Sequence, residues 1–306
     1  MKKISIIIPH KNNMEGLKRL LNSIPENDEV EVIVVDDHSE GKIVRDLFSE
    51  FVSPNLSIYQ NETNIYSAGK ARNIGLEKVT GEWLLFADSD DYFVEGWLDT
   101  IYRYIDAEEE LIYFIPTSIH EETEDFSTRH IPRKDLIKAH LNKQNMKTEY
   151  QLRGKFPEPW SKMIKLDLVK RNKILFDETR YANDVSFSKK VGIYANKIKS
   201  VDKTIYCVTE NNTSLTKQIS EESIKIRVQV YVESVIFSKQ NLTNKQFRYA
   251  TSSALQWYGT GIKNKFSKTY YKHITSEIIK NKLPIRPFSF LETAIKKYYI
   301  YRGNKK

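Results

Sequence analysis

The chain has 306 residues, of which 40% are hydrophobic, and 48 Lys and Arg against 40 Asp and Glu give it a net charge of +8. This size and composition describe a soluble globular chain with one large domain or two smaller ones. The single cysteine, Cys207, excludes an internal disulfide, and no apolar stretch approaches the roughly 18 residues of a membrane span.

The positive charge points to an anionic partner: nucleic acid, an anionic membrane surface or a phosphorylated substrate. No nucleic-acid-binding module is recognisable, and Lys and Arg are spread along the chain with some concentration at its end, so the last two are favoured. The basic and apolar start, residues 2–8, imitates a signal peptide, but Pro9 cuts the apolar run too short for one. We therefore expect a first strand here and a cytoplasmic protein.

Strands and helices are predicted to alternate over the first 90 residues. The strands are short and almost continuously apolar, whereas the helices carry apolar residues at spacings of three and four. Strands are predicted at 3–9, 30–35, 56–59 and up to residue 87, with helices from Asn12 or Asn13 to Ile24, at 42–51 and at 67–78, and a loop at 61–66. This pattern is typical of a parallel sheet that is covered on both faces.

Polar residues follow three of these strands, at Pro9-His10, at Asp36-Asp37 and at 88–91. In parallel sheets, ligands bind beyond the carboxyl ends of the strands, so these three clusters are expected to meet at one edge. Asp36 and Asp37 are well placed to accept hydrogen bonds from a nucleoside, although a simple turn is the alternative. Neither a Gly-x-Gly-x-x-Gly nor a Gly-Lys-Ser/Thr loop is present, which disfavours a dinucleotide or a P-loop nucleotide.

The acidic cluster at 88–91 places three carboxylates within four residues, at Asp88, Asp90 and Asp91. Like charges this close repel each other unless a cation shares them. Oxygen ligands suit Mg²⁺ or Mn²⁺, which take one or two carboxylates and complete their shell with phosphate and water. The cluster therefore predicts a metal site for a phosphorylated ligand, with an acidic turn as the alternative. The cations of the stretch 69–73 are expected near the same edge of the sheet. The alternative is that they lie on a solvated helix face.

Beyond residue 100, the sequence predicts a strand at 111–115 and an exposed, acid-rich loop at 120–130. After Ser220, a helix-start signal competes with an alternation of Ile and Val typical of strands, and the helical surroundings favour a helix. Amphipathic helices are predicted over 245–280 and 287–302. The final stretch, 296–306, mixes cations with aromatic residues, which suits a membrane-surface anchor, a dimer contact or a solvated helix end.

Several motifs resemble, in order and spacing, the inverting family 2 glycosyltransferases with the GT-A fold. These are the strand that ends in Pro9, and residues 34–39, 71–75 and 81–91. Residues 159–163, 174–178, 183–187 and 206–215 are similar to the acceptor side of bacterial capsule and surface-polysaccharide transferases. The resemblance implies an α/β, GT-A (Rossmann-like) fold, with a mostly parallel sheet, helices on both faces and a helical C-terminal region. It implies a domain at 1–216, with a nucleotide-sugar half at 1–100 and an acceptor half at 101–216, and a C-terminal region at 217–306.

The resemblance also implies roles for individual residues. Asp37 would hold the uracil ring, and Asp88 and Asp90 would form the Asp-x-Asp pair that holds Mn²⁺ or Mg²⁺, with Asp90 the more direct ligand. Asp184 matches the general base. The full set expected to bind the nucleotide sugar is Pro9, His10, Asp37, Arg72, Asp88 and Ser89. Arg72 is expected near the diphosphate. His10 is included because it directly follows a strand; the alternative is that this histidine has no role in binding.

The acceptor is expected to contact Trp160 and Asn183. The Trp160 ring suits the apolar face of a sugar, although a large aromatic residue is also a normal part of a core. Members of the family usually carry Glu before the base, where this chain has Asn183. An Asn cannot supply that neighbouring charge.

The sequence therefore predicts a metal-dependent inverting transferase that moves a sugar from a UDP-sugar to a growing cell-surface or capsular glycan. The acceptor suggested by the family is a polyprenyl-linked oligosaccharide at the cytoplasmic face of the membrane, with the C-terminal helices contacting the membrane or a second copy of the chain. One alternative is a nucleotidyltransferase, disfavoured because the loop after the first strand lacks glycines. The other is a catalytically silent scaffold for glycan assembly, suggested by Asn183.

Overall fold

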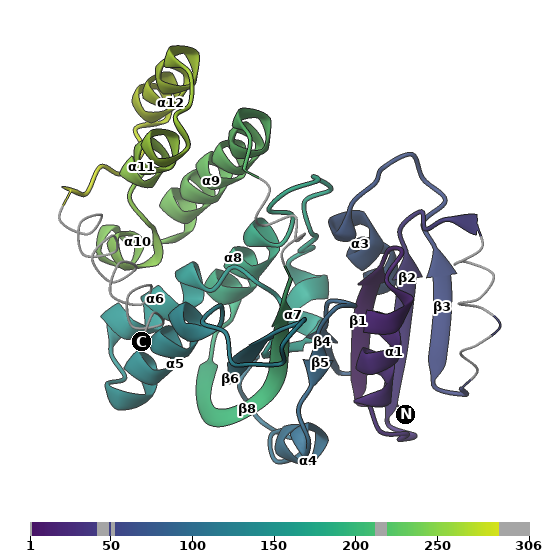
Figure 1. Cartoon of the computed structure of the whole chain (residues 1–306). Coiled ribbons are helices and arrows are strands. Elements are labelled where there is room, and N and C mark those ends of the chain that lie inside the picture. Colours follow the sequence, from purple (N-terminus) through teal and green to yellow (C-terminus); the bar gives the residue numbers. More distant parts are fainter. Residues whose placement is uncertain (1, 42–48, 50–52, 212–218, 288–306) are drawn as a thin grey trace.

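The computed structural model describes residues 2–41, 49, 53–211 and 219–287. A sheet with the strand order β3-β2-β1-β4-β7-β6-β8-β5 runs through the larger part of the molecule, and four helices near the end of the described chain form a separate layer beside it (Figure 1). The helices predicted at 42–51 and 287–302, and the final stretch 296–306, lie outside the described residues.

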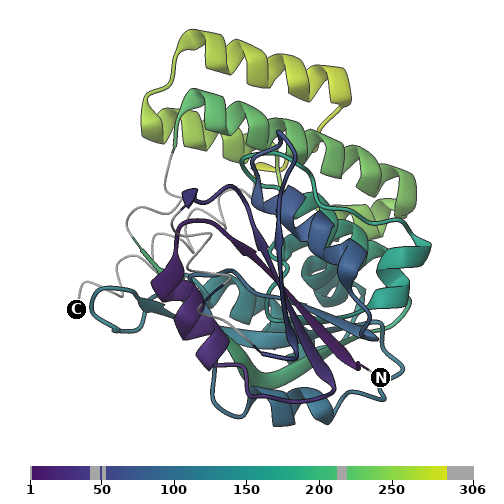
Figure 2. The ribbon, with the colours of Figure 1, turned by 90° about the vertical axis from the view of Figure 1, so that its right-hand side faces the viewer.

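The first half of the sheet is parallel, as the sequence predicts. Strands β3, β2, β1 and β4 pair side by side in the same direction, and every residue of β1 is buried. Figure 2 shows helices α1 and α3 on opposite sides of β1 and β2, which explains why these strands are apolar on both faces. The elements of this half are β1 Ile4–His10, α1 Met14–Asn22, β2 Val30–Asp36, β3 Leu56–Gln60, α3 Ala68–Lys78 and β4 Trp83–Phe86.

The second half of the sheet is mixed. Strand β7 runs antiparallel to both β4 and β6, β8 is parallel to β6, and the short β5 is antiparallel to β8. The predicted strand at 111–115 is the first half of β6, and the acid-rich stretch that follows is largely exposed, as expected. The elements of this half are β5 Tyr92–Phe93, α4 Trp97–Tyr102, β6 Leu111–His120, α5 Ile131–Asn142, α6 Met146–Lys155, β7 Lys162–Lys165, α7 Leu166–Arg171, α8 Val185–Tyr194 and β8 Ile198–Glu210.

The C-terminal region is helical, and the ambiguous segment after Ser220 is a helix. Ser220 caps that helix by accepting a hydrogen bond from the backbone N–H of Ser223, and its buried Ile and Val residues join a second apolar core with the helices that follow. None of the described helices is both long and apolar enough to cross a membrane. The helices are α9 Glu221–Asn241, α10 Asn244–Ala250, α11 Leu255–Asn264 and α12 Lys268–Asn281.

The amphipathic pattern over 245–280 does not form one continuous helix. The structure divides this range into α10, α11 and α12. At the first break, the hydroxyl of Thr251 donates to the carbonyl of Phe247. At the second, Lys265 adopts a left-handed conformation and Ser267 caps the next helix. Local hydrogen bonds from Ser and Thr compete with the helix backbone in this way, and they leave the apolar spacing unchanged.

Helix α6 is held between two close neighbours by glycines. A Cβ atom on Gly192 of α8 would overlap with the carbonyl oxygen of Arg153 on α6, and one on Gly154 of α6 would overlap with the carbonyl oxygen of Ala250 on α10. The buried Arg153 guanidinium then donates to the carbonyls of Gly192 and Ala195, at 2.7 and 2.6 Å. These contacts join the C-terminal region, through α10 and α6, to the helix that begins next to Asp184.

We expect Gly192→Ala to lower the free energy of unfolding by about 1–3 kcal/mol, since the added methyl group forces α8 away from α6. Urea denaturation followed by circular dichroism measures this change. Lys190→Ala on the same helix is the matched control and should have a smaller effect. Equal stability of Gly192→Ala and the unchanged protein would contradict the close approach.

Candidate active site

The carboxyl ends of β1, β2 and β4 meet at one edge of the sheet, as the sequence predicts. His10 pairs with Asp36 in the β1–β2 register, and Ala87, directly after β4, donates its N–H to the carbonyl of Ile7 on β1. The N–H of Asp37 donates to the carbonyl of His10 at 2.7 Å. The residues expected to bind a nucleotide therefore start from adjacent strands.

His10 and Asp36 form a buried pair beneath this edge. The His10 side chain is 1% exposed, and its Nδ1 lies 2.9 Å from Asp36 Oδ1. Burial opposes ionisation of Asp36, but hydrogen bonds from His10 and Ser39 prevail and lower its pKa. The expected contact of His10 with a ligand is therefore not supported by its position: its imidazole holds Asp36 from inside the protein.

Asp37 lies next to Asp36, and its carboxylate accepts a hydrogen bond from Asn61 Nδ2 at 2.7 Å. Asn61 also donates to the carbonyl of Ile65, so Asp37 is tied to the loop at 61–66. At the same edge, the rings of His38 and Tyr66 lie 4.0 Å apart, and Tyr66 remains 58% exposed. Sequence reasoning missed this exposed aromatic residue, because only the folded loop brings Tyr66 to His38.

In the acidic cluster, Asp91 differs from the other two carboxylates. It is 2% exposed, and its oxygens accept hydrogen bonds from the Thr209 backbone N–H at 2.7 Å and from the Tyr206 hydroxyl at 2.9 Å. The Tyr206 oxygen in turn accepts the N–H of Asp88. Asp91 thus attaches the cluster to β8, whereas the Asp88 carboxylate is paired with Arg72.

Asp88 and Asp90 have the chemistry of a partial metal site. Burial and the negative charge of Asp88 raise the pKa of Asp90 to about 6. No group of three or more His, Cys, Asp or Glu that could hold a metal occurs in the described residues. Two carboxylates fit Mg²⁺ or Mn²⁺ in a site whose remaining ligands are phosphate and water.

Helix α3 connects this donor side to the segment 176–183. Gly69 allows the approach, because a Cβ atom there would overlap with the carbonyl oxygen of Asp177. The Asn73 side chain pairs with the backbone of Phe176, donating to its carbonyl at 3.0 Å and accepting its N–H at 2.9 Å. The 69–73 stretch is therefore a buried contact and not the solvated helix face that was its alternative.

Arg72 lies at the centre of that contact and is 4% exposed. Its guanidinium donates to Asp88 Oδ1 at 2.5 Å and to Asn183 Oδ1 at 2.9 Å. Asn183 also donates to the carbonyl of Thr179 at 3.3 Å, a bond that a carboxylate could not make. An amide thus satisfies both neighbours, which gives a structural reason for Asn where the family usually has Glu.

Asp184 directly precedes α8, and its side chain makes no capping hydrogen bond. Burial and the negative charge of Glu158 raise its pKa to about 6, against the opposing effect of Arg72. A carboxylate with this proton affinity can accept a proton near neutral pH.

Glu158 belongs to a group of charges that sequence reasoning missed, in which Arg133 and Glu158 are half-buried and Lys162 is buried. Both of its carboxylate oxygens accept hydrogen bonds from Arg133 of α5. Lys162 Nζ donates to the carbonyls of Phe156 and Glu158, at 2.8 and 2.6 Å, and so holds the turn that carries Glu158. Burial lowers the pKa of Lys162 to about 7. No motif marks Arg133 or Glu158, because they meet only through the packing of α5 on this turn.

Trp160 is part of the core. It is 3% exposed, and its ring stacks on Tyr206, with centroids 5.8 Å apart and planes at 15°. The expectation that Trp160 forms an open platform for an acceptor sugar is therefore wrong: its faces are covered by protein. Through Tyr206, the ring supports the backbone of Asp88 from below.

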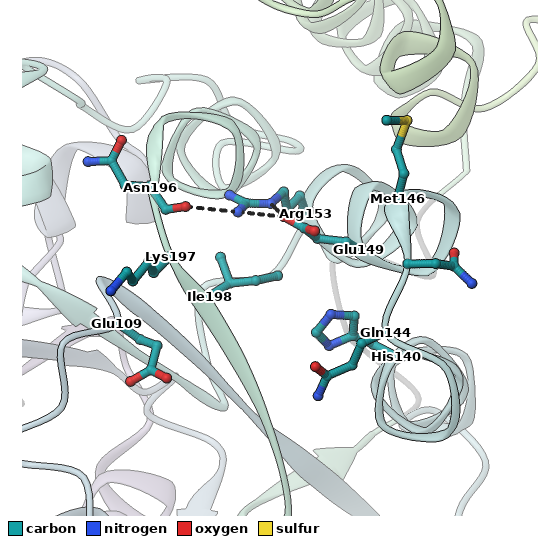
Figure 3. A pocket seen from close by; sticks show the side chains of 10 residues that line it. Glu109, His140, Gln144, Met146, Glu149, Arg153, Asn196, Lys197 and Ile198 are labelled. Atoms are coloured by element: carbon teal, nitrogen blue, oxygen red, sulfur yellow. Dashed lines mark hydrogen bonds and ion pairs between the residues drawn. The ribbon is translucent and has the colours of Figure 1, made fainter.

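A pocket of about 360 Å³ lies elsewhere, between α5, α6 and the start of β8 (Figure 3). Its lining includes His140, Glu149, Arg153 and Lys197. Glu149 and the carbonyl of Asn196 already bind the Arg153 guanidinium, and His140 Nδ1 lies 2.7 Å from Ser200 Oγ. None of the residues expected to bind donor or acceptor lines it, so this pocket is separate from the candidate active site.

Comparison with known proteins agrees with the geometry. Residues 5–170 match the family model described as glycosyl transferase family 2. The chain is 31% identical to the poly(ribitol-phosphate) beta-N-acetylglucosaminyltransferase TarS of Staphylococcus aureus over 226 residues, which are 69% of this chain but only 36% of that protein. It is 24% identical to the glycosyltransferase GlyA of Streptococcus pneumoniae, over 76% of this chain and 34% of that protein.

Solved structures show the same fold. Residues 1–349 of S. aureus TarS in complex with UDP-GlcNAc superpose with a TM-score of 0.65 and 24% identity, covering 87% of this chain and 74% of that one. The mannosyltransferase PcManGT of Pyrobaculum calidifontis, in complex with GDP-Man and Mn²⁺, superposes with a TM-score of 0.52 and 15% identity, covering 90% and 84%. The GT-A architecture expected from the motifs is thereby confirmed.

We expect Asn183→Ala to lower the free energy of unfolding by about 1–3 kcal/mol, because it removes one acceptor of a buried guanidinium. Urea denaturation measures the change. Asn142→Ala, an exposed residue on α5, is the control and should be within about 0.5 kcal/mol of the unchanged protein. If the two variants are equally stable, the Arg72–Asn183 bond does not hold the segment.

Proposed function

Because the chain belongs to glycosyl transferase family 2 and is a glycosyltransferase, we propose that it transfers a sugar from a UDP-sugar to a growing cell-surface or capsular glycan, with inversion at the anomeric carbon. The observation that carries the proposal is the contact of Arg72 with both Asp88 and Asn183. One cation thereby joins the expected phosphate side to the residue beside the expected base. Sugar transfer needs both sides within one site, and the family match favours it over nucleotidyl transfer.

The donor side is built from the strand ends. In our proposal, Asp37 accepts hydrogen bonds from the uracil ring, Pro9 and Ser89 line the pocket, and His10 acts indirectly by holding Asp36. Support for a UDP-sugar comes from the relative named an N-acetylglucosaminyltransferase and from the similar structure that holds UDP-GlcNAc. An N-acetylhexosamine or hexose is the sugar class we propose.

Asp88 and Asp90 would hold Mn²⁺ or Mg²⁺ on this side. When bound, the ion would offset the negative charge that builds on the leaving diphosphate. Arg72 adds a fixed positive charge next to Asp88, in a buried setting where electrostatic interactions are stronger than in water. A positive charge that acts on the leaving group in the transition state accelerates the reaction more than one that binds only the ground state.

On the acceptor side, Asp184 would take the proton from the attacking hydroxyl. General base catalysis of this kind contributes about 10²–10⁴-fold. A single attack on the face opposite the leaving group inverts the anomeric centre. Asn183 would then position the base through Arg72, and the catalytic domain would comprise residues 1–216, with 217–306 as a region that contacts the acceptor, the membrane or a second copy.

The central test is slow release of UDP from donor without acceptor. We expect the purified protein to release UDP from one UDP-sugar of a panel in the presence of Mn²⁺ or Mg²⁺, and EDTA or Asp90→Ala to abolish the release. Glu95→Ala, an exposed carboxylate near the cluster, is the control and should leave it unchanged. Absence of release with every donor and metal, together with no thermal shift, would favour the scaffold alternative.

The pH dependence of transfer tests the base. We expect the rate to fall as the pH drops through about 6, because Asp184 becomes protonated there and can no longer accept a proton. Asp184→Asn should lower the rate by about 10²–10⁴-fold at neutral pH. Glu158→Gln should shift the midpoint to lower pH, because removal of its charge lowers the proton affinity of Asp184.

The exposed Glu122→Gln is the control for this series and should leave the midpoint unchanged. A midpoint that does not move in Glu158→Gln would show that the charge of Glu158 does not set the proton affinity of Asp184.

A further inference from the structure

The positive charge of the chain is concentrated in the C-terminal helices. Residues 219–287 contain 12 Lys and Arg but only 4 Asp and Glu, so their net charge of +8 equals that of the whole chain. A charge of one sign on one region attracts partners of the opposite sign. The remaining residues, which include the catalytic domain, have no net charge between them.

A group of exposed lysines lies at one end of this region. We call it the basic strip, and its members are Lys225, Lys263, Lys265, Lys268 and Lys272. The backbone N–H and hydroxyl of Ser267, in the turn between α11 and α12, bind the carboxylate of Glu221 at the start of α9, at 2.6 and 3.0 Å. Because residues four apart on a helix share a face, Lys225 lies on the same face of α9 as Glu221, which makes this contact.

The lysines of the basic strip have no carboxylate partners within the described part of the chain. Each of the five is exposed, and none takes part in an ion pair there. Some other lysines of the described chain do: Lys138, Lys165 and Lys197 are paired with Asp or Glu at 2.5–2.7 Å. The basic strip is thus available to an external anion.

The basic strip is linked to the candidate active site by the first turns of α9. Helix α9 packs against α8, whose first residue follows Asp184 (Figure 1). Arg227, about 9 Å along the helix axis from Glu221, places its guanidinium 5.3 Å from the centre of the Tyr181 ring. Tyr181 precedes Asp184 by three residues, so Arg227 lies between the segment that carries the proposed base and the basic strip.

The chemistry of the strip favours a polyanion over insertion into a membrane. The exposed positions of α11 and α12 are Ile262, Lys263, Lys268, Thr269, Lys272, Thr275, Ser276, Ile279 and Lys280, and only Ile262 and Ile279 among them are apolar. A helix that lies in a membrane interface presents a broad apolar face, which is absent from this set. Lysine side chains on a polar surface suit phosphate groups, which they bind as flexible point charges.

We propose that the basic strip binds an acceptor chain that carries phosphodiester groups, and guides it past Arg227 to Asp184. This rests on the proposed function, and it specifies the acceptor as an anionic, phosphate-containing glycan or polyol polymer. The lysines bind phosphates that lie some distance from the reacting hydroxyl, so successive units of one polymer occupy the strip and the active site together. Binding is electrostatic and therefore weakens with salt.

The test measures binding of a phosphodiester-linked polyol oligomer of defined length by isothermal titration calorimetry, with neutral dextran of similar mass for comparison. The test variant combines Lys263→Gln, Lys268→Gln and Lys272→Gln. The matched control combines Lys143→Gln, Lys147→Gln and Lys203→Gln, which removes the same charge from exposed lysines on the catalytic domain. Thermal melting confirms that both variants fold.

We expect the unchanged protein to bind the oligomer but not dextran, with affinity falling as salt rises. The strip variant should bind about 10-fold more weakly, and the control within about twofold, since exposed charges are screened and each contributes modestly. Equal weakening in both variants, or no weakening in either, would overturn the proposal.

The last experiment measures binding of the unchanged protein and of the strip variant to vesicles that contain phosphatidylglycerol. If the strip variant loses vesicle binding while oligomer binding is unaffected, the strip is a membrane contact and the proposal is wrong. UDP release by the unchanged protein without acceptor is measured in parallel. Because that release does not involve the oligomer, a failure of the acceptor proposal is distinguishable from a failure of the glycosyltransferase proposal.

Discussion

The arrangement of the site depends on the buried guanidinium of Arg72. A cation that is 4% exposed must be neutralised and hydrogen-bonded, or its burial costs several kcal/mol. Arg72 meets that requirement with Asp88 from the end of β4 and with Asn183 from the segment before α8. The glycines of α3 allow this: Gly69 lets the helix touch Asp177, and at Gly75 a Cβ atom would lie 2.6 Å from Ile7 Cγ2 of β1. Donor and acceptor sides are therefore positioned by one helix.

On the proposed acceptor side, charged residues likewise pair around Asp184. Glu158 raises the proton affinity of Asp184, and it remains ionised because Arg133 binds both of its oxygens. Lys162 is buried as well, yet it makes backbone hydrogen bonds that hold the Glu158 turn in place. Replacing such groups by apolar residues is often neutral for stability. Of these groups, Glu158 is the one whose charge raises the pKa of Asp184.

The C-terminal helices complement the catalytic domain in charge and attach to it by close packing. Glycines on α6 and α8 bring the helices into backbone contact, and α10 and α9 pack on them in turn. As a result, a region with a net charge of +8 is fixed next to the helix that starts at Asp184. In the acceptor path that we propose, this close packing fixes the lysines of the basic strip relative to Asp184.

The sequence by itself determined the parallel half of the sheet, because buried parallel strands must be continuously apolar and their covering helices must repeat at three and four. It also determined where the donor residues lie, since Asp37, Asp88 and Asp90 follow strands whose ends necessarily share one edge. Tertiary structure alone decided the rest. The breaks in 245–280 depend on local Ser and Thr hydrogen bonds that leave the apolar spacing intact. Trp160 is part of the core, and the His10 side chain is buried, because burial depends on neighbouring residues from other strands. The pairing of Arg133 with Glu158, and of Arg72 with Asn183, joins residues 25 and 111 positions apart, and no local pattern encodes such contacts.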